Sequence, residues 1–369
     1  MVAINRSAEA PIRELRISTF VIPTDQPESD GTLEWDKTTM VLVELEAGGQ
    51  TGLGYTYADR SAATLIAGLL RDRVVGRDVM DVPAIAANLM GAVRNQGQRG
   101  IAAMAVSAID AALWDTKARV LGLPLVKLLG AARDQATVYG SGGFTSYTVE
   151  KLCAQLTGWA ADGIGAVKMK VGRDVAADLQ RARAVREALG AGPELFVDAN
   201  GAYERKQALE MAEHFARLGV TWFEEPVSSD DLAGLRLLRD RVPPPIRIAA
   251  GEYGFRPTTF RRLLNAGAVD VLQADATRCG GPTGFLQAGG IADTAQIPLS
   301  AHCAPSLHRH LCLAVPRYLN LEYFHDHCRI EHLLFDGAAT AVDGALRADL
   351  ARPGMGLELK RKDAERFAV

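Results

Sequence analysis

The chain has few cysteines, and their spacing matches no common cross-link. Its 369 residues include five cysteines, at positions 153, 279, 303, 312 and 328, an odd number without a Cys-x-x-Cys pair. A disulfide framework or a structural zinc site would need paired cysteines. We therefore expect reduced thiols, most of which fill space in the protein core.

Long hydrophobic runs and a strong charge of one sign are also missing. No apolar run approaches the roughly 20 residues of a membrane span, and the first twenty residues carry charges such as Arg6 and Arg16 in place of a signal-like apolar segment. The formal net charge of −3 gives no reason to expect nucleic acid or an anionic membrane as a partner. These absences favour a soluble, cytoplasmic protein that acts on a small molecule.

A regular alternation of short apolar runs with longer Ala-, Leu- and Arg-rich stretches fills most of the chain. The runs are rich in β-branched and aromatic residues and the stretches between them have helical periodicity, which is typical of βαβ units. Eight such runs predict a closed parallel α/β barrel with its functional residues at the carboxyl ends of the strands. The predicted strands span residues 136–143, 166–171, 195–200, 221–226, 246–252, 270–276, 298–303 and 318–324.

The N-terminal part of the chain differs in kind from the barrel. Residues 12–23 and 39–58 predict antiparallel strands joined by a polar stretch, and helical patterns follow them. We expect an α+β capping domain over residues 1–130, completed by the charged residues 346–369, which should pack back on it. The barrel domain then covers residues 131–345.

Three carboxylates end consecutive predicted strands. Asp198, Glu224 and Glu252 are spaced 26 and 28 residues apart, about one strand, one helix and two loops. A barrel would bring them to one rim as a cage for a hard divalent cation, for which oxygen ligands favour Mg²⁺, with Mn²⁺ as a substitute. Asn200 shares the strand face of Asp198 and is a candidate for a second-shell or water-mediated contact. Glu225 alternates away from the mouth, so we expect it to make a structural ion pair.

Two further pairs of polar residues end other predicted strands. Lys168 and Lys170 point the same way because they are two apart on a strand, and adjacent ammonium groups lower each other's pKa. A Lys-x-Lys pair is more often a solvated strand edge, but beside three carboxylates it predicts a base. Asp275 and His302 end adjacent strands, where Asp275 can fix the imidazole tautomer. A core histidine with a capping aspartate is the alternative interpretation of that pair.

Five more histidines cluster towards the C-terminus without the spacing of metal ligands. We expect them to be structural or solvent-exposed, although His325 and Asp326 follow the eighth strand and could reach the rim. No glycine-rich phosphate cradle follows the last two strands, which disfavours a phosphorylated substrate. The five histidines are His308, His310, His325, His327 and His332.

The order of these motifs resembles the enolase superfamily and, within it, the mandelate racemase subgroup. Residues 108–130 are similar to the helix and linker that lead into that family's barrel. The motifs in chain order are Lys-Met-Lys (168–170), Val-Asp-Ala-Asn (197–200), Glu-Glu-Pro (224–226), Gly-Glu (251–252), Asp-Ala-Thr-Arg-Cys-Gly-Gly (275–281), Ser-Ala-His (300–302) and Leu-Glu (321–322).

The resemblance implies a modified TIM barrel of the type (β/α)7β under an α+β cap, and a role for each motif. It implies that Asp198, Glu224 and Glu252 bind Mg²⁺. Lys170 would be the base on one face of the substrate, with Lys168 assisting it and the substrate carboxylate. His302 with Asp275 would serve the other face, and a protonated Glu322 would donate a hydrogen bond to an enediolate. These implied roles agree with the chemistry, because an α-proton next to a carboxylate is removed only if both carboxylate oxygens are stabilised.

The function that follows is dehydration of a sugar acid, an aldonate or aldarate. It would proceed by α-proton abstraction and an enediolate to a 2-keto-3-deoxy acid. Racemisation or epimerisation of an α-hydroxy acid is the alternative, whereas a non-catalytic binding barrel is disfavoured because every expected catalytic position is filled. By the same resemblance, cycloisomerases and dipeptide epimerases carry a lysine where this chain has Asp275.

The cap should provide the substrate specificity. We expect residues 22–32 and the stretch around Tyr55 and Tyr57 to cover the barrel mouth. The first stretch is polar, as a polyhydroxylated substrate requires, although Trp35 and its apolar neighbours could build an apolar wall instead. We further expect a homo-oligomer whose ligand is a small-molecule carboxylate.

Overall fold

A closed parallel barrel is the centre of the structure. The computed structural model describes residues 10–369, so Arg6 lies outside the described residues. Strands β4 to β11 lie side by side in chain order, and β11 pairs with β4 to close the sheet. All eight predicted strands are confirmed within a few residues. They are β4 (Ala136–Ser141), β5 (Ala166–Lys170), β6 (Glu194–Asp198), β7 (Val220–Glu224), β8 (Arg247–Ala250), β9 (Val271–Ala274), β10 (Leu299–Ala301) and β11 (Tyr318–Phe324).

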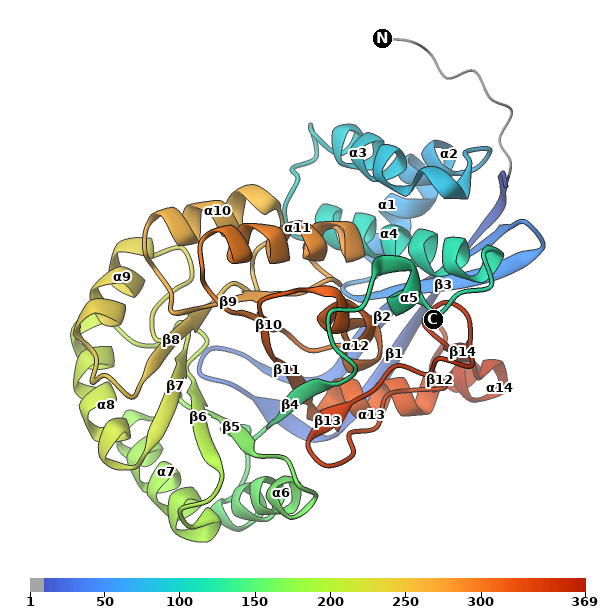
Figure 1. Cartoon of the computed structure of the whole chain (residues 1–369). Helices are drawn as coiled ribbons and strands as arrows, with labels where there is room; N and C mark the ends of the chain where they lie inside the picture. The colour runs from blue at the N-terminus through green and yellow to red at the C-terminus, as the bar shows by residue number, and fades with distance from the viewer. Residues whose placement is uncertain (1–9) are drawn as a thin grey trace.

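Seven helices connect these strands and surround the barrel (Figure 1). They bury apolar faces against the sheet, as in a (β/α)7β barrel. An additional helix, α13 (His325–Leu334), follows the last strand. The connecting helices are α6 (Val149–Ala161), α7 (Val175–Leu189), α8 (Arg205–Arg217), α9 (Leu232–Arg241), α10 (Pro257–Asn265), α11 (Gly281–Thr294) and α12 (Pro305–Ala314).

The cap is a three-stranded antiparallel sheet with helices on one face. Its strands are β1 (Ile12–Ser29), β2 (Glu34–Ala47) and β3 (Gln50–Tyr57), paired in that order. Residues 61–74 form a continuous helical segment with a π-helical middle turn. The helical segments are α1 (Ser61–Leu65), η1 (Ile66–Leu70), α2 (Arg71–Val74), η2 (Val79–Asp81), α3 (Val82–Ala92), α4 (Ile101–Val120) and α5 (Leu125–Leu129).

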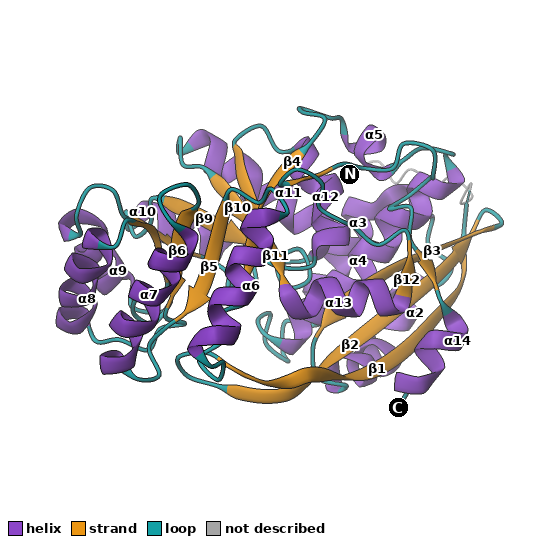
Figure 2. Cartoon of the chain, turned by 90° about the horizontal axis from the view of Figure 1, so that it is seen from below, coloured by secondary structure: helices purple, strands orange, loops and turns teal. Residues whose placement is uncertain are grey.

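The polar stretch after Ile22 is strand, not the loop that its composition predicts. Strands β1 and β2 continue as a long hairpin that extends from the cap along the barrel (Figure 2), with a register shift between Pro23 and Glu28. The tip of the hairpin is held by the barrel, because Thr145 donates its backbone N–H to the carbonyl of Ser29 at 2.8 Å. Glu28 is buried and accepts a hydrogen bond from Trp35 Nε1 at 2.9 Å. These contacts outweigh the low strand propensity of the sequence.

The C-terminal segment lies against the cap sheet. Arg361 pairs with Glu44 at 2.6 Å, and the backbone N–H of Val369 donates to the carbonyl of Thr19. Met355 donates its backbone N–H to the buried Asp115 of α4. These contacts support the proposed division into a capping domain (1–130 with 346–369) and a barrel domain (131–345).

Short elements near the C-terminus complete the fold. One of them, β13, adds an antiparallel strand beside β4. Among residues 10–369, no helix is both long and apolar enough to cross a membrane. The short elements are β12 (Phe335–Asp336), β13 (Ala345–Leu346), β14 (Glu358–Leu359), α14 (Arg361–Ala364) and η3 (Glu365–Phe367).

Close packing of β3 on α4 fixes the cap helix to its sheet. A Cβ added at Gly54 would lie 2.2 Å from the backbone nitrogen of Ala112 and 2.4 Å from the carbonyl oxygen of Ala108. Real Cβ atoms do not approach backbone atoms so closely, so only glycine fits there. Helix α4 also contacts the barrel, since Trp114 Nε1 donates to Thr283 Oγ1 of α11 at 2.9 Å. The glycine therefore sets the distance between sheet, helix and barrel.

We predict that Gly54→Ala destabilises the protein by about 3 kcal/mol, because an overpacked core must shift backbone. Gly158, exposed near the C-terminal end of α6, is the matched control, since a Cβ there meets nothing within 4 Å. Gly158→Ala should raise the free energy of unfolding by roughly 0.5–1 kcal/mol. Urea unfolding of both variants measures this, and equal effects of the two substitutions would contradict the packing argument.

Candidate active site

The candidate residues converge because neighbouring barrel strands end in register. Lys170 on β5 lies opposite Asp198 on β6, and Asp198 lies opposite Glu224 on β7. Glu252 follows the end of β8, and β11 carries Glu322. Parallel strands that end at one level present their last side chains to one mouth. The structure therefore brings together the candidate side chains that the sequence predicts at the ends of separate strands.

The carboxylates of Asp198, Glu224 and Glu252 form one cluster. Each offers an oxygen atom within 4.8 Å of the others, and all three residues are buried. The Oε2 atom of Glu252 is buried and makes no hydrogen bond, although His302 Nε2 lies 3.3 Å from it. Three buried carboxylates repel one another unless a cation joins them, and an all-oxygen donor set suits Mg²⁺. The residues present therefore fit the predicted cation.

Glu225 does not make the structural ion pair that strand alternation predicted. It is buried with its Oε1 atom unpartnered, and no cation pairs with it among residues 10–369. Strand alternation fails because β7 ends at Glu224 and Glu225 has a positive φ of 36°. Burial, followed by the charges of Glu252 and Asp198, raises the pKa of Glu225 well above its usual value.

Asn200 contacts the cluster through its backbone. Its N–H donates to Asp198 Oδ1 at 2.9 Å, and its φ is 47°. The side-chain oxygen Oδ1 is buried without a hydrogen-bond partner. The residue therefore orients Asp198 directly, and its side chain keeps a free acceptor next to the carboxylates, as a water-mediated contact requires.

The two lysines differ in position and contacts. Lys168 is fully buried, and its Nζ lies 2.7 Å from Glu224 Oε1, 2.8 Å from Glu322 Oε1 and 3.4 Å from Asp198 Oδ2. Lys170 lies beside the cavity described below and pairs with Asp198 Oδ2 at 2.5 Å. Lys168 is not among the cavity-lining residues, contrary to the expectation that it meets the substrate carboxylate. It holds the ends of four strands together.

The pKa of each lysine is raised, although we expected each ammonium group to lower the pKa of the other. Burial is the largest effect and lowers the pKa of Lys170, and Lys168 lowers it further, but the carboxylates of Asp198, Glu322 and Glu224 together outweigh both. Burial likewise lowers the pKa of Lys168, while Glu224 and Glu322 raise it to a net value well above normal. The carboxylates thus dominate the ammonium repulsion. A divalent cation on the same carboxylates would oppose this effect.

His302 is held in a fixed orientation by Asp275, as predicted. Nδ1 of the ring lies 2.8 Å from Asp275 Oδ2, so Nε2 faces the mouth. Burial lowers the pKa of His302, but Cys303, Glu252 and Glu322 outweigh it, and the net pKa is raised well above normal. Asp275 in turn accepts from the backbone N–H and hydroxyl of Thr277. The pair is therefore suited to hold and donate a proton.

Glu322 is ionised in this arrangement, whereas the resemblance implied a protonated donor. Burial raises its pKa, but Lys168 and then His302 lower it to a net value far below normal. Its Oε1 also accepts from Ser141 Oγ at 2.6 Å. Lys168 at 2.8 Å is the physical reason, because a paired ammonium stabilises the carboxylate form. Glu322 can donate only after it receives a proton.

A cavity of about 430 Å³ lies between the barrel mouth and the cap. Lys170, Glu252, His302 and Glu322 line its floor. The expectation that both cap segments reach the mouth is confirmed by Asp30 and Tyr57 in the lining. Most polar residues of 25–32 do not face it. The cap residues in the lining are Asp30, Leu33, Trp35, Lys37, Thr38, Thr39, Tyr57, Ala58 and Asp59.

Several residues that line the cavity were not predicted from the sequence. Arg278 lines the cavity and pairs with Glu252 at 3.2 Å, and its position three residues after Asp275 was the available signal. His327 also lines it, stacked on Tyr57 with ring centroids 3.4 Å apart, contrary to a merely structural role. His325 pairs with Asp25 at 3.1 Å and does not line the cavity.

The other histidines are structural, as predicted. His308 and His310 are buried and bond backbone atoms, since Ala276 N–H donates to His308 Nε2 and His310 Nε2 lies 3.0 Å from the carbonyl of Met355. His332 bonds the carbonyl of Cys328 and the hydroxyl of Thr340. These rings support the backbone around the last barrel strands.

Both parts of the chain match one protein family. Residues 16–130 match the mandelate racemase/muconate lactonizing enzyme N-terminal domain, and residues 151–364 match the enolase C-terminal domain-like family. The chain belongs to the mandelate racemase group of the enolase superfamily. The predicted family and the barrel-and-cap fold are thereby confirmed.

A solved relative of this family is very similar in structure. It is a mandelate racemase/muconate lactonizing enzyme-like protein from Rubrobacter xylanophilus, with 55% identity and a TM-score of 0.96 over 97% of this chain and 100% of that one. The L-talarate/galactarate dehydratase of Salmonella typhimurium is 34% identical over 85% of this chain and 81% of its own. Its structure with Mg and L-lyxarohydroxamate has a TM-score of 0.88, covering 98% of this chain and 93% of that one, at 31% identity.

Relatives with other reactions also match. The 3,6-anhydro-alpha-L-galactonate cycloisomerase of Streptomyces coelicolor is 31% identical over 97% of this chain and 99% of its own. Further relatives are named as dehydratases and as an epimerase. The relatives thus include cycloisomerases as well as dehydratases and an epimerase.

We predict that Mg²⁺ raises the melting temperature of the protein and that Glu224→Gln abolishes the effect, because a ligand that binds only the folded state stabilises it. Glu225→Gln is the matched control, since it removes an adjacent buried carboxyl that lies outside the cluster. Thermal unfolding after chelation, with and without Mg²⁺, measures the shift.

The cluster assignment is contradicted if the wild type shows no shift. It is equally contradicted if Glu225→Gln loses the shift while Glu224→Gln keeps it.

Proposed function

We propose that the chain is a Mg²⁺-dependent hydro-lyase that dehydrates a sugar acid to a 2-keto-3-deoxy acid. The observation that supports this most is that Lys170 and His302 both line one cavity next to the carboxylate cluster. They come from β5 and from the end of β10, three strands apart around the closed sheet. A substrate in the cavity would thus meet a proton acceptor and a proton donor on different sides.

The chain's own residues divide the chemistry. When bound, Mg²⁺ would supply positive charge for the substrate carboxylate and withdraw Asp198 from Lys170. Lys170 would take the α-proton, and His302 would give a proton to the departing β-hydroxyl, which is a poor leaving group without a donor. Asp275 keeps Nδ1 of His302 occupied and Nε2 directed at the cavity. Lys168 and Glu322 hold the strand ends in place.

Features of the cap favour a sugar diacid as substrate. Lys37 lines the cavity, is exposed, and makes no ion pair within residues 10–369. Thr38 and Thr39 follow it in the lining, so the cap contributes one ammonium group and two hydroxyl-bearing residues, of which Thr38 already donates its hydroxyl to Asp326 Oδ2. A second carboxylate and hydroxyls would find polar partners there, beside the rings of Trp35 and Tyr57 that also line the cavity. An aldarate therefore fits better than an aldonate.

Racemisation or epimerisation is the second candidate. Acid and base on two sides of one cavity also suit proton exchange at a single carbon, and an epimerase occurs among the relatives. The two reactions share the first step, removal of the α-proton. They differ in whether a β-hydroxyl leaves.

We predict that a library of sugar mono- and diacids, incubated with the enzyme and Mg²⁺, yields a semicarbazide-reactive 2-keto product, with diacids turned over best. Lys37→Gln should raise the KM for diacids about tenfold, the loss of roughly one ion pair, and leave monoacids unchanged. Steady-state kinetics of both proteins measure this.

Absence of a keto product, together with inversion at the α-carbon of a simple 2-hydroxy acid, would assign the protein as a racemase. Equal loss of mono- and diacid turnover in Lys37→Gln would remove the argument for a diacid.

A further inference from the structure

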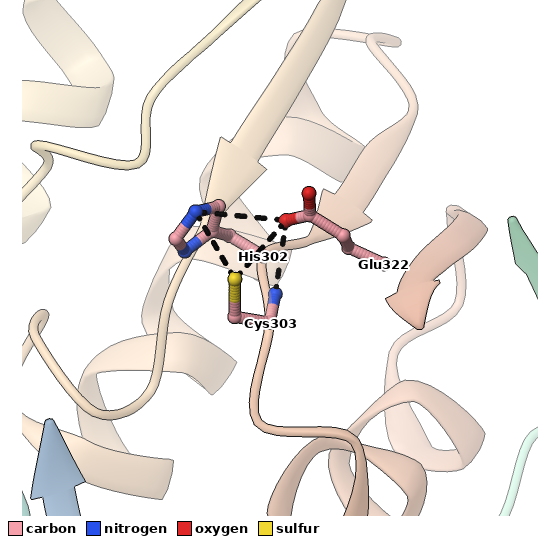
Figure 3. Close-up of side chains that lie close together, drawn as sticks. All are labelled: His302, Cys303 and Glu322. Carbon is pink, nitrogen blue, oxygen red and sulfur yellow. Dashed lines mark hydrogen bonds and ion pairs between the residues drawn. The ribbon is translucent and has the colours of Figure 1, made fainter. Parts of the chain in front are cut away.

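His302, Cys303 and Glu322 bring three different metal-binding atoms together beside the carboxylate cluster (Figure 3). The sulfur of Cys303 lies 3.3 Å from His302 Nε2 and 3.3 Å from Glu322 Oε2. His302 Nε2 lies 3.5 Å from Glu322 Oε2 and 3.3 Å from Oε2 of Glu252, which belongs to the carboxylate cluster. All three residues are buried, and all three line the cavity. None of the proposed steps uses the thiol.

These separations match the ligand shell of tetrahedral zinc. With Zn–S near 2.3 Å and Zn–N and Zn–O near 2.0–2.1 Å, tetrahedral geometry places the ligand atoms about 3.3–3.6 Å apart. The observed 3.3, 3.3 and 3.5 Å agree with that range to within about 0.3 Å. A single point thus lies at bonding distance from all three atoms. Because all three residues line the cavity, water could complete the shell.

The remaining atoms of these residues are already occupied in the way that a zinc site requires. His302 Nδ1 is bonded to Asp275, which directs Nε2 outward, as in carboxylate–histidine–zinc arrangements. Glu322 Oε1 is bonded to Ser141 and Lys168, while Oε2 faces the sulfur and accepts the backbone N–H of Cys303 at 3.2 Å. Cys303 has a φ of 55°, and this turn after β10 brings its side chain beside Glu322.

We propose that His302, Cys303 and Glu322 form a second metal site, which binds a thiophilic divalent cation such as Zn²⁺ and blocks the enzyme when filled. Binding displaces the thiol proton of Cys303, and any proton on Nε2, to solvent, while the carboxylate enters unchanged. No electrons are transferred. Soft sulfur and borderline nitrogen ligands select Zn²⁺ over Mg²⁺, whereas the all-oxygen cluster of Asp198, Glu224 and Glu252 retains Mg²⁺.

The blocking effect rests on the proposed function, because it requires His302 to act in catalysis. The binding itself rests only on the three ligand atoms. Two separate readouts therefore test the two statements.

The binding readout uses Co²⁺ as a spectroscopic stand-in for Zn²⁺. Added to the full-length protein in saturating Mg²⁺, one equivalent of Co²⁺ should give a sulfur-to-cobalt charge-transfer band that Zn²⁺ removes. Cys303→Ala should lose the band and bind Zn²⁺ at least about tenfold more weakly, since even an indirect metal contact contributes that much. Cys153→Ala, which removes a half-buried thiol outside the cluster, should keep both properties.

Three results would overturn the site. The first is that the wild type shows no charge-transfer band, and the second is that Cys303→Ala keeps the band. The third is that Zn²⁺ binds both proteins equally and is displaced by Mg²⁺. The last result would place Zn²⁺ on the three carboxylates. An unchanged Mg²⁺-induced melting shift in Cys303→Ala shows that the variant is folded, and Cys303→Ser provides a second variant of similar size.

The activity readout uses whichever sugar acid the enzyme turns over. Zn²⁺ should inhibit at saturating Mg²⁺, and the inhibition constant should rise at least about tenfold in Cys303→Ala. Equal inhibition of both proteins would contradict the blocking role. If no sugar acid is turned over, the proposed function fails while the cobalt spectrum still decides the metal site.

Discussion

Excess negative charge buried at the barrel mouth is the constraint on which the rest of the structure depends. The fully buried Lys168 lies within 3.4 Å of the carboxylates of Asp198, Glu224 and Glu322. It therefore connects the ends of four strands. Each uncompensated buried charge costs several kcal/mol, so this arrangement is stable only as a balanced set. The fixed cations at the mouth are Lys168, Lys170 and Arg278, beside His302. The buried carboxyl groups are those of Asp198, Glu224, Glu225, Glu252, Asp275 and Glu322. A divalent cation would add positive charge to a set in which carboxyl groups outnumber the cations, which connects folding of the mouth to the proposed chemistry.

The cap completes the site by closing over this charged floor. Its orientation depends on contacts that are themselves buried, such as Tyr55 Oη donating to Glu331 Oε1 at 2.6 Å and Thr56 Oγ1 donating to the carbonyl of Thr277. Strand β3 therefore places Tyr57 and Asp59 over the cavity, while the β1–β2 hairpin places Trp35 and Lys37 there. In the proposed function the barrel carries the proton chemistry, and the cap selects the substrate.

The barrel was predictable from sequence because each strand is a short apolar run ending in a polar residue, and such runs are stabilised locally as well as by the sheet. Positions at the ends of these strands also predicted the site residues, namely the three carboxylates, the lysine pair and the His302–Asp275 pair. Features that depend on distant contacts were not predictable. The hairpin beyond Ile22 exists because its tip bonds Thr145, 116 residues from Ser29. Glu225 does not follow strand alternation because its backbone has a positive φ. His327 lines the cavity because α13 places its ring against that of Tyr57. The ionised state of Glu322 depends on Lys168, which no local pattern places next to it.

The proposed function requires that Lys170 and His302 carry separate proton transfers in one cavity. Solvent deuterium exchange at the α-carbon, followed by NMR in D₂O with Mg²⁺ and a sugar acid that the enzyme turns over, tests it most directly. The account predicts that His302→Asn loses elimination but still exchanges the α-proton through Lys170, whereas Lys170→Ala loses that exchange. Both variants should keep the Mg²⁺-induced melting shift. Loss of all exchange in His302→Asn, with exchange retained in Lys170→Ala for every sugar acid, would contradict the account.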